Sequence, residues 1–358
     1  MADRVICFTD NLGSGGAQRQ MVGLACMLKE RGYDVSVVLY YDTPFYKPML
    51  DDADIESTVV KNSNYIGRIW SMYRYFRKNK GATIIAYQET PSLIACLLRP
   101  FIRCHKLIVS ERNTTQVMSK MDRLRFRLYR FADHIVPNSF SQAKFIGKHY
   151  PKLESKITTI TNFVDTDYFY PADRSDFTLK RTNTVVVVGS HKPQKNFHRF
   201  VDAVKMLADK SVNLHIKWYG IFPEYISEHN AYIESLNLSS VIDVYGPTKD
   251  IRDAYQTADF FCLPSLFEGF PNVLCEAMSC GLPVICSDVC DNPYIVSKTA
   301  AGSGALFNPL DVMDIAVKIE TMISISDEQW HQYADANRHT SEQLFSKNSF
   351  IDKYIDLL

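Results

Sequence analysis

The sequence predicts an α/β protein with two doubly wound domains, each built on a parallel sheet. Short runs rich in Val and Ile alternate with helix-patterned segments along nearly the whole chain, as in parallel sheets covered by helices on both faces. The length of 358 residues suits two domains that each bury a core. A polar stretch around 165–176, which contains Pro171, interrupts the alternation and is the expected linker.

The N-terminal half is expected to hold five strands with helices between them. The strands are 5–9, 35–40, 83–87, 107–109 and 134–136, and the helices include 18–29, 66–76 and 121–131. Apolar residues at helical spacing should form the stripe that packs on the sheet. The members of these stripes are Ile66, Ile69, Trp70, Tyr73 and Phe76 in one helix, and Met121, Leu124, Leu128 and Phe131 in the other.

The C-terminal half repeats the pattern. The expected strands are 185–188, 214–219, 241–245, 260–263, 284–286 and 305–307, and the helices are 196–208, 250–257, 271–280 and 311–323. In the last segment, Ile351, Ile355 and Leu358 share one helical face, so this segment should dock rather than extend into solvent. Two domains joined by a linker would face each other across a cleft, a usual place for a ligand.

Charge is divided unequally between the two halves. Residues 1–165 hold 24 Lys and Arg against 15 Asp and Glu, whereas residues 166–358 hold 16 against 25. Arg123, Arg127 and Arg130 form a basic stripe at helical spacing. Two interpretations stay open: a solvated helix surface, or a face for anionic lipid headgroups or a polyanionic acceptor. Nucleic acid is disfavoured, because no recognition motif accompanies the charge.

The composition favours a cytoplasmic protein. No apolar run reaches the ~18–20 residues that a membrane-spanning helix needs. The N-terminus lacks the apolar region and cleavage pattern of a signal peptide. The nine cysteines are odd in number and contain no Cys-x-x-Cys pair, which is typical of free thiols in a reducing compartment.

Two glycine-containing turns lie between an expected strand and an expected helix. The first, Gly13–Gly16, precedes a helix whose free N–H groups and positive dipole end suit an anion. The dinucleotide fingerprint needs glycine where Gln18 stands, so a simple tight turn is the alternative. The second turn, 189–196, carries Lys192 and Lys195, which can meet a phosphate or can simply face solvent.

The third motif, residues 264–283, is the most informative. A strand leads into a loop with Glu268, and a helix then starts near Pro271 and ends at Cys280-Gly281. Glu276 lies inside that helix, and the N–H groups of Asn272 and Val273 at its start are expected to be free for an anion. Two carboxylates around such a helix end suit a ligand with phosphate in its middle and hydroxyls at both ends. A nucleotide sugar is such a ligand.

With these motifs the chain resembles the retaining glycosyltransferases of family 4, and the likeness covers nearly its full length. The matching segments are 265–285 with its Glu-x7-Glu pair, Gly13–Arg19, Gly189 with Lys195-Asn196, Asn162–Asp165 and Gly304–Phe307. The resemblance implies the GT-B fold, in which two Rossmann-like domains face each other across a cleft. It implies an acceptor-binding domain at 1–168, a nucleotide-sugar-binding domain at 169–340 and a C-terminal helix, 341–358, docking back toward the first domain.

The resemblance also implies roles for individual residues. Glu276 would bind the ribose hydroxyls, Glu268 would contact the transferred sugar, and Lys195 would neutralise the diphosphate as it departs. The full set implied for the donor is Gly15, Gly16, Gly189, Ser190, Lys192, Lys195, Glu268, Gly269, Phe270, Pro271, Asn272, Val273 and Glu276.

Two positions depart from the family pattern. Ser190 stands where the family usually has a phosphate-binding arginine, so Lys192 or His191 would have to substitute. Arg112 stands where many members carry a histidine; it cannot act as a base and would orient the donor sugar or the acceptor as a third catalytic residue. Glu111, Arg123, Arg127 and Arg130 are the candidates for the acceptor or membrane side.

The expected activity is sugar transfer from a nucleoside diphosphate sugar, with UDP as the expected nucleotide, to a hydroxyl of a glycan or lipid-linked glycan, with retention. No cofactor or metal is expected, because the Asp-x-Asp triplets 52–54 and 165–167 follow no convincing buried strand. The alternatives are a 2-epimerase or phosphorylase on the same fold, or an inactive nucleotide-sugar or glycan-binding protein. The protein is expected in the cytoplasm, with peripheral contact to the inner membrane face as an extension.

Overall fold

A computed structural model describes residues 3–61, 64–173, 181–248 and 250–358. The chain forms two compact units: unit 1 comprises Met1–Phe163 and Lys347–Leu358, and unit 2 comprises Val164–Ser346. The units therefore change at 163/164 and 346/347, where the sequence suggested 168/169 and 340/341. The end of the expected linker, from 174, lies outside the described residues.

Unit 1 is built on a six-stranded parallel sheet in the order β3-β2-β1-β4-β5-β6. Its strands are β1 (Arg4–Phe8), β2 (Asp34–Leu39), β3 (Glu56–Val59), β4 (Thr83–Tyr87), β5 (Leu107–Glu111) and β6 (His134–Pro137). Five of them were predicted. The edge strand β3 was missed because its sequence, Glu-Ser-Thr-Val, has no apolar run.

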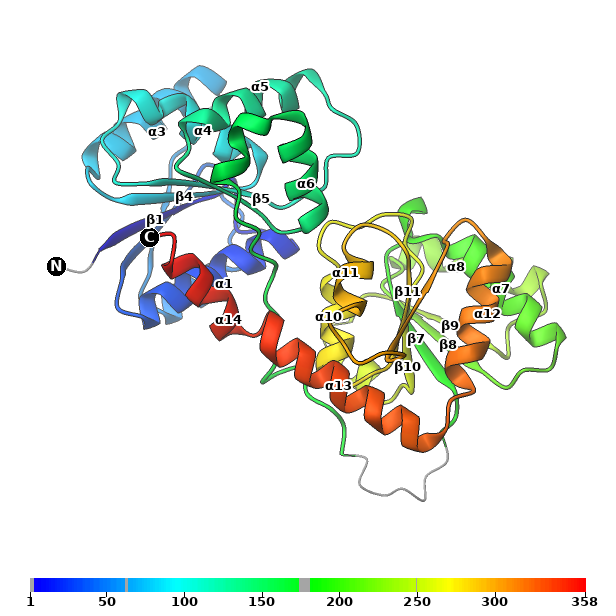
Figure 1. Cartoon of the computed structure of the whole chain (residues 1–358). Coiled ribbons are helices and arrows are strands. Elements are labelled where there is room, and N and C mark those ends of the chain that lie inside the picture. The colour runs from blue at the N-terminus through cyan, green and yellow to red at the C-terminus, as the bar shows by residue number, and fades with distance from the viewer. Residues whose placement is uncertain (1–2, 62–63, 174–180, 249) are drawn as a thin grey trace. The chain divides into compact units, whose positions relative to one another are not determined.

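Helices cover both faces of this sheet (Figure 1). The helices are α1 (Gly16–Glu30), α2 (Lys47–Asp52), α3 (Tyr65–Lys78), α4 (Glu89–Leu98), α5 (Lys120–Leu128), α6 (Phe140–His149) and α14 (Lys347–Ile355), with short 3-10 turns η1 (Arg99–Phe101), η2 (Tyr129–Phe131) and η3 (Pro151–Lys156). One core cluster lies under α1 and α14, and a second lies under α3, α4, α5 and α6. The predicted docking of the C-terminal helix is realised through Phe350, Ile351 and Tyr354.

The predicted inward stripes of α3 and α5 are wrong only in part, because Phe76 is buried and Ile69, Tyr73 and Leu128 pack against the core. On α3 the buried residues are Arg68, Met72 and Phe76, whereas Ile66 and Trp70 are exposed. On α5 the buried residues are Arg125 and Phe126, whereas Met121 and Leu124 are exposed. The stripes failed because each helix packs an arginine that finds a partner inside unit 1. A search for apolar residues at helical spacing does not detect a buried arginine.

Unit 2 contains the second parallel sheet, in the order β12-β11-β10-β7-β8-β9. Its strands are β7 (Thr184–Val188), β8 (His215–Tyr219), β9 (Ile242–Tyr245), β10 (Phe260–Leu263), β11 (Val284–Ser287) and β12 (Gly304–Phe307). All six agree with the sequence prediction to within one residue at either end. The order reverses direction at the neighbouring strands β10 and β7, where a doubly wound sheet binds its ligands.

The helices of unit 2 pack in layers on the two faces of its sheet, with α7 against α12 and α10 against α13 (Figure 1). The helices are α7 (Phe197–Asp209), α8 (Pro223–Ser235), α9 (Ile251–Gln256), α10 (Asn272–Ser279), α11 (Asn292–Val296), α12 (Val312–Ile323) and α13 (Asp327–Phe345), and the short turn η4 spans Pro193–Lys195. Among the described residues, none of the helices combines the length and the hydropathy that a membrane crossing requires. The predicted two-domain α/β architecture is confirmed.

Candidate functional site

The carboxyl ends of β7 and β10 bring two loops of unit 2 together. Leu266 donates its backbone N–H to the carbonyl oxygen of Gln194 at 2.8 Å, and the Gln194 side chain donates to the Phe267 carbonyl oxygen at 2.6 Å. The two loops are 189–196 and 264–271, the second and third motifs of the sequence. Adjacent parallel strands place them side by side at one sheet edge.

Asn196 fixes the end of the first loop. It adopts a left-handed backbone conformation with φ of 60° directly before α7, which asparagine tolerates better than most residues. Its buried side-chain amide donates to the carbonyl oxygens of Pro264 at 3.1 Å and Pro309 at 2.8 Å. One amide thus connects the loops that follow β7, β10 and β12.

Gly189 makes room for the side chain of Lys195. A Cβ atom at this glycine would lie 3.2 Å from Cγ of Lys195 and 3.3 Å from its Cδ, closer than ordinary packing allows. The Gly189 carbonyl oxygen accepts a hydrogen bond from the Trp218 indole at 2.8 Å, which fixes the end of β7. The lysine stem therefore lies over the glycine, and its direction is set by close packing.

Glu268 and Lys195 form an ion pair at this sheet edge. The Lys195 ammonium lies 2.6 Å from Oε1 of Glu268, and the buried hydroxyl of Ser265 donates to the same oxygen at 2.6 Å. Both charged side chains are largely shielded from solvent. The structure thus brings together two predicted site residues and adds Ser265, which the sequence analysis did not select.

Glu276 is buried on α10 with a polar partner. The hydroxyl of Tyr255, from α9, donates to Oε2 of Glu276 at 3.3 Å. The predicted end of this helix is confirmed, since Gly281 has φ of +74° and its N–H bonds to the Met278 carbonyl oxygen. No sequence signal pointed to Tyr255, because it comes from a different element.

The start of α10 differs in one detail from the prediction. The N–H of Asn272 donates to the carbonyl oxygen of Phe270 at 3.0 Å, so this donor is not free for an anion. The reason is the turn at Phe270 and Pro271, which folds the chain back on itself before the helix begins at Asn272.

Cys290 is a further residue of this region, which the sequence analysis counted only as one of nine free thiols. Its Sγ accepts a hydrogen bond from the backbone N–H of Glu268 at 3.4 Å. Its backbone has φ of 51°, a left-handed conformation that is uncommon for a residue with a side chain. Burial raises the pKa of the half-buried thiol. The thiol thus supports the loop that carries Glu268.

The remaining predicted donor residues of unit 2 differ in exposure. Ser190 and Gly269 are partly buried and Lys192 is exposed, whereas Phe270 is buried and packs edge-on against Phe345. Pro271 is buried and Val273 is partly buried. The ring of His191, next to Ser190, stacks on Tyr225 with a centroid distance of 3.8 Å. This contact holds the imidazole against α8.

In unit 1, the turn Gly13–Gly16 precedes α1 as predicted. The N–H of Gly13 bonds to the Asn11 side chain at 2.7 Å, and Gly15 is the residue directly before the helix. A Cβ at Gly15 would lie 2.2 Å from the Gln18 side-chain oxygen, so a larger residue here would displace the end of the Gln18 side chain. Gly16 opens the helix.

Arg112 is buried inside unit 1. Its guanidinium lies 4.2 Å from the ring centre of Tyr87, donates to Asn162 at 2.9 Å and donates to the hydroxyl of Tyr354 on α14. Through these contacts Arg112, which directly follows β5, links that strand to the C-terminal helix α14.

Glu111 is fully buried in a polar cluster of unit 1. Its carboxylate lies 3.1 Å from Nε of Arg125 and accepts hydrogen bonds from Tyr129 and Gln142. Burial raises its pKa to about 7, against the opposing effect of Arg125 and the two hydrogen bonds. Arg123, Arg127 and Arg130 are exposed on the other side of the helical segment.

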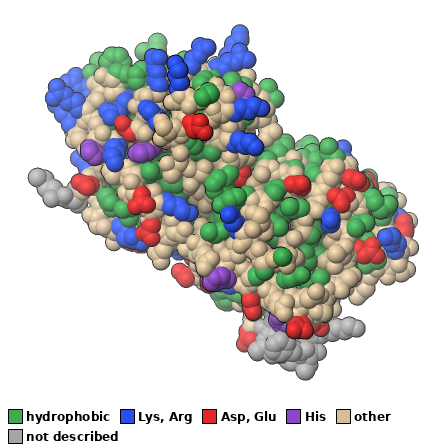
Figure 2. Space-filling model, viewed as in Figure 1, with side chains coloured by type: hydrophobic (Ala, Val, Ile, Leu, Met, Phe, Trp, Pro, Cys, Tyr) green, Lys and Arg blue, Asp and Glu red, His purple; other side chains and the backbone are tan. Residues whose placement is uncertain are grey.

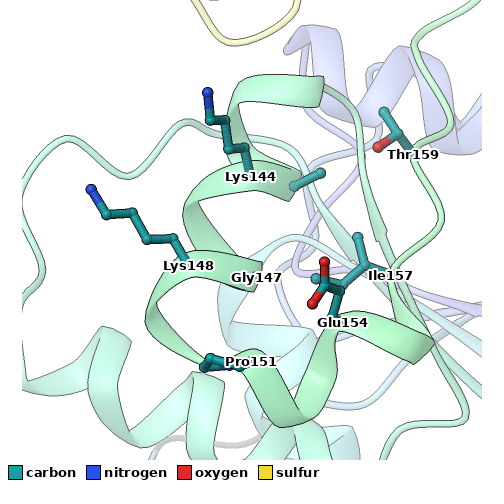
Figure 3. Close-up of a pocket in the computed structure, with 8 residues that line it drawn as sticks. Lys144, Gly147, Lys148, Pro151, Glu154, Ile157 and Thr159 are labelled. Atoms are coloured by element: carbon teal, nitrogen blue, oxygen red, sulfur yellow. The ribbon is translucent and has the colours of Figure 1, made fainter.

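A cavity in unit 1 lies between α6 and η3 and measures about 540 Å³. Figure 3 shows Lys144 and Lys148 on α6 extending away from Glu154, which lies on the opposite side of the helix ribbon. Surface lysines that extend away from the glutamate do not by themselves make a binding site. Within the described part of the chain, no three His, Cys, Asp or Glu residues are placed to hold a metal ion.

Comparisons with known proteins agree with this architecture. Residues 14–168 match the family model described as Glycosyltransferase Family 4, and residues 182–324 match Glycosyl transferases group 1. A Campylobacter jejuni protein named as an N-acetylgalactosaminyltransferase acting on a diphospho-undecaprenol-linked sugar is 25% identical over 296 residues, 78% of this chain and 80% of its own length. The amylovoran biosynthesis glycosyltransferase AmsD of Erwinia amylovora is 25% identical over 290 residues, 80% of each chain.

Solved structures share the fold. The Anabaena protein HepE in complex with UDP superposes with a TM-score of 0.85 at 19% identity, over 99% of both chains. The lipopolysaccharide outer core galactosyltransferase WaaB superposes with a TM-score of 0.80 at 17% identity, over 99% of this chain and 98% of that one.

Proposed function

The chain belongs to the family 4 glycosyltransferases with the GT-B fold, and from this premise we propose that it transfers a sugar from UDP-sugar to a hydroxyl of a lipid-linked glycan, with retention of configuration. The observation that carries the proposal is the shielded Lys195–Glu268 pair at the sheet edge where β7 and β10 meet. UDP is chosen as the nucleotide because structural neighbours were solved with UDP and UDP-glucose. The lipid-linked acceptor follows the names of relatives that act on diphospho-undecaprenol substrates.

Lys195 is proposed as the cation that stabilises the leaving diphosphate. Negative charge grows on the β-phosphate as the bond to the anomeric carbon breaks. A lysine that is already fixed by Gly189 packing and by Glu268 needs little rearrangement to meet that charge. This cation is proposed to act without a metal, so activity should persist when divalent ions are chelated.

Glu268 is proposed to lie beside the transferred sugar. The transition state carries positive charge on the sugar ring, and a carboxylate close to it is stabilising. The Ser265 hydroxyl donates to the Glu268 carboxylate, and the Cys290 thiol accepts a hydrogen bond from the backbone N–H of Glu268. The acceptor oxygen forms the new bond to the anomeric carbon, and UDP and the acceptor proton are the other products.

Glu276 is proposed to bind the ribose hydroxyls. A carboxylate accepts hydrogen bonds from both hydroxyls of a ribose, and Tyr255 holds one of its oxygens. The backbone of 269–273, with Ser190 and Lys192, is proposed to complete the donor site. In unit 1, Gly15 and Gly16 are proposed for the donor, and Arg112 and Glu111 for positioning on the acceptor side, where their burial limits them to indirect roles.

A donor panel tests the proposal. The full chain is mixed with UDP-, GDP-, ADP- and TDP-sugars, and its thermal unfolding midpoint is measured. A true donor stabilises the fold as RT ln(1 + [L]/Kd), so the UDP-sugars should stand out. UDP release on addition of a polyprenyl-diphosphate glycan, with the product anomer determined by NMR, then tests transfer and retention. Interconversion of the free sugar nucleotide would indicate an epimerase, and donor binding without turnover would indicate an inactive binding protein.

A further inference from the structure

Two helices of unit 1 bury arginine while they expose large apolar side chains. On α3, Arg68 is 7% exposed, whereas Ile66 is 82% and Trp70 is 60% exposed. On α5, Arg125 is 5% exposed, whereas Met121 is 57% exposed. The inward faces still bury Met72, Phe76 and Phe126, but each helix also carries exposed apolar side chains that ordinary amphipathic packing would leave polar.

The orientation of α3 is fixed by an aromatic cage. The Arg68 guanidinium lies 4.3 Å from the ring centre of Tyr40, 4.8 Å from that of Tyr41 and 5.0 Å from that of Tyr65. It also donates to the Tyr41 hydroxyl at 3.2 Å. Because cation–π contacts hold Arg68 inward, the opposite face with Ile66 and Trp70 must point outward.

The orientation of α5 is fixed by an ion pair. Arg125 contacts the fully buried Glu111 at 3.1 Å and Asp122 at 2.9 Å. A buried charge that loses its partner is costly, so this pair prevents the helix from turning Leu124 inward. Rotation of either helix would break a specific buried contact, and the outward apolar faces are therefore built into the fold.

The short turn after α4 continues the apolar surface. Helix α4 contacts both α3 and α5, and it is followed by η1, in which Phe101 is 67% exposed. A groove of about 390 Å³ lies between α3 and the α4–η1 segment. Its lining residues are all apolar or aromatic: Ile66, Ile69, Trp70, Tyr73, Leu98 and Phe101.

Basic side chains surround this apolar surface. Residues 65–131 contain 14 Lys and Arg against three Asp and Glu, and two of the three acids, Glu111 and Asp122, are engaged by Arg125. Figure 2 shows Lys and Arg side chains gathered over this part of unit 1, with hydrophobic side chains between them. The exposed basic residues of this segment are Arg74, Arg77, Lys78, Lys80, Arg103, Lys120, Arg123, Arg127 and Arg130.

We propose that the face of unit 1 formed by α3, η1 and α5 docks on a membrane that contains anionic phospholipid. Trp and Tyr side chains favour the headgroup level of a bilayer, and exposed apolar residues between them can enter the acyl boundary. Each basic side chain near an anionic surface adds to the attraction. The inference is related to the proposed function through the lipid-linked acceptor. The observations that support it do not depend on the proposed reaction.

The charge argues against a second copy of this chain as the occupant. Two such faces brought together would place their basic rims against each other, and like charges in contact are unfavourable. A surface that is both apolar and anionic complements the exposed apolar side chains and also the basic side chains around them. A phospholipid bilayer presents such a surface.

The test uses the full chain and sedimentation with vesicles, without donor or acceptor. Vesicles of phosphatidylcholine alone are compared with vesicles that also contain phosphatidylglycerol. Binding should be strong only with phosphatidylglycerol and should weaken with salt. Arg123→Gln with Arg127→Gln should lower partitioning about 30-fold, from ~1 kcal/mol per basic residue. The matched control is Lys144→Gln with Lys148→Gln, which has the same spacing on α6 beside the cavity of Figure 3 and should change partitioning far less.

Apolar insertion is tested with Ile66→Ser and Trp70→Ser together. This variant should lose binding even at low salt, whereas Leu310→Ser with Met313→Ser, two exposed apolar residues of unit 2, should not. Retained unfolding midpoints and an unchanged thermal shift with UDP show that the variants are folded. Trp70 fluorescence should shift to the blue on binding.

Three outcomes would overturn the proposal: no binding of the folded protein to anionic vesicles, equal losses in the α3/α5 variants and their controls, or concentration-dependent dimerisation through this face. Failure of the donor panel alone would leave it standing. Success of the donor panel without vesicle binding would overturn this proposal and leave the proposed reaction intact.

Discussion

The ammonium of Lys195 lies 2.6 Å from a carboxylate oxygen of Glu268, although 72 residues separate the two in sequence. The pairing of β7 with β10 brings their loops to one sheet edge, and the amide of Asn196 connects them. Lys195 is thereby fixed before any ligand arrives. A fixed charge stabilises a transition state better than a mobile one, because no reorganisation is needed during the reaction.

Removal of the Lys195 charge should slow transfer, and it should also lower the unfolding midpoint because the shielded Glu268 carboxylate loses its cation. Lys195→Met is expected to lower kcat about 10²–10³-fold, since one donor to the leaving charge is lost. Steady-state kinetics with UDP-sugar measures the change. Lys205→Met, in the same unit and paired with Asp209 on α7, is the control and should keep normal kcat. Equal kcat in the two variants would remove Lys195 from the proposed mechanism.

Loss of the Glu276 charge should weaken donor binding. Glu276→Gln is expected to raise the Kd for UDP about 10- to 100-fold, because hydrogen bonds to a charged group contribute ~1.5–3 kcal/mol. Tyr255→Phe removes the hydroxyl that holds Oε2 of Glu276 and should raise Kd less. Titration calorimetry with UDP measures both. If the double variant showed the sum of the two single effects, Tyr255 would not act through Glu276.

Arginine at position 190 should strengthen donor binding. Ser190 follows Gly189 at the end of β7, where the resemblance implies a phosphate-binding arginine. A guanidinium makes two parallel hydrogen bonds to phosphate, so Ser190→Arg is expected to lower the Kd for UDP about tenfold. Ser190→Gln, which adds length without charge, should leave Kd near its original value. An Arg variant that binds UDP no better would place the diphosphate elsewhere.

Glu111 should make the stability of unit 1 depend on pH. Its pKa is about 7 in the folded chain against an ordinary value of 4.5, so the folded state holds the proton more tightly than the unfolded state. This stabilisation is fully present below about pH 4.5 and is lost as the pH rises through about 7. In Glu111→Gln, the free energy of unfolding should no longer decrease as the pH rises through this range. Denaturant unfolding across the window measures the slope, with Glu154→Gln as the surface control.

UDP should protect Cys290 from alkylation. The half-buried thiol lies at the backbone N–H of Glu268, so a ligand contacting Glu268 would shield it. Mass spectrometry after iodoacetamide treatment should show less label on Cys290 when UDP-sugar is present. Cys26 and Cys104 are also half-buried and serve as internal controls with unchanged labelling. Equal protection at all three would reflect global stabilisation and would not support a donor next to Glu268.

The sequence by itself determined the two-domain α/β architecture and the positions of eleven of the twelve strands. These strands could be found because a buried parallel strand consists of a continuous run of apolar residues. It also marked both loops of the candidate site, because glycine turns, a proline before a helix and Gly281 with its positive φ leave local signals. Local signals depend on neighbours in the chain and can be read without a structure. The edge strand β3, which lacks an apolar run, could not be found in this way.

Only the tertiary structure decided which residues meet. Ser265 and Cys290 at Glu268, and Tyr255 at Glu276, come from segments whose proximity depends on sheet order. The same holds for the outward faces of α3 and α5. Helical periodicity favoured burying Ile66 and Leu124, but the tyrosine cage of Arg68 and the Arg125–Glu111 pair turn those faces to solvent. A buried charge must find its partner, and that partner is supplied by the fold.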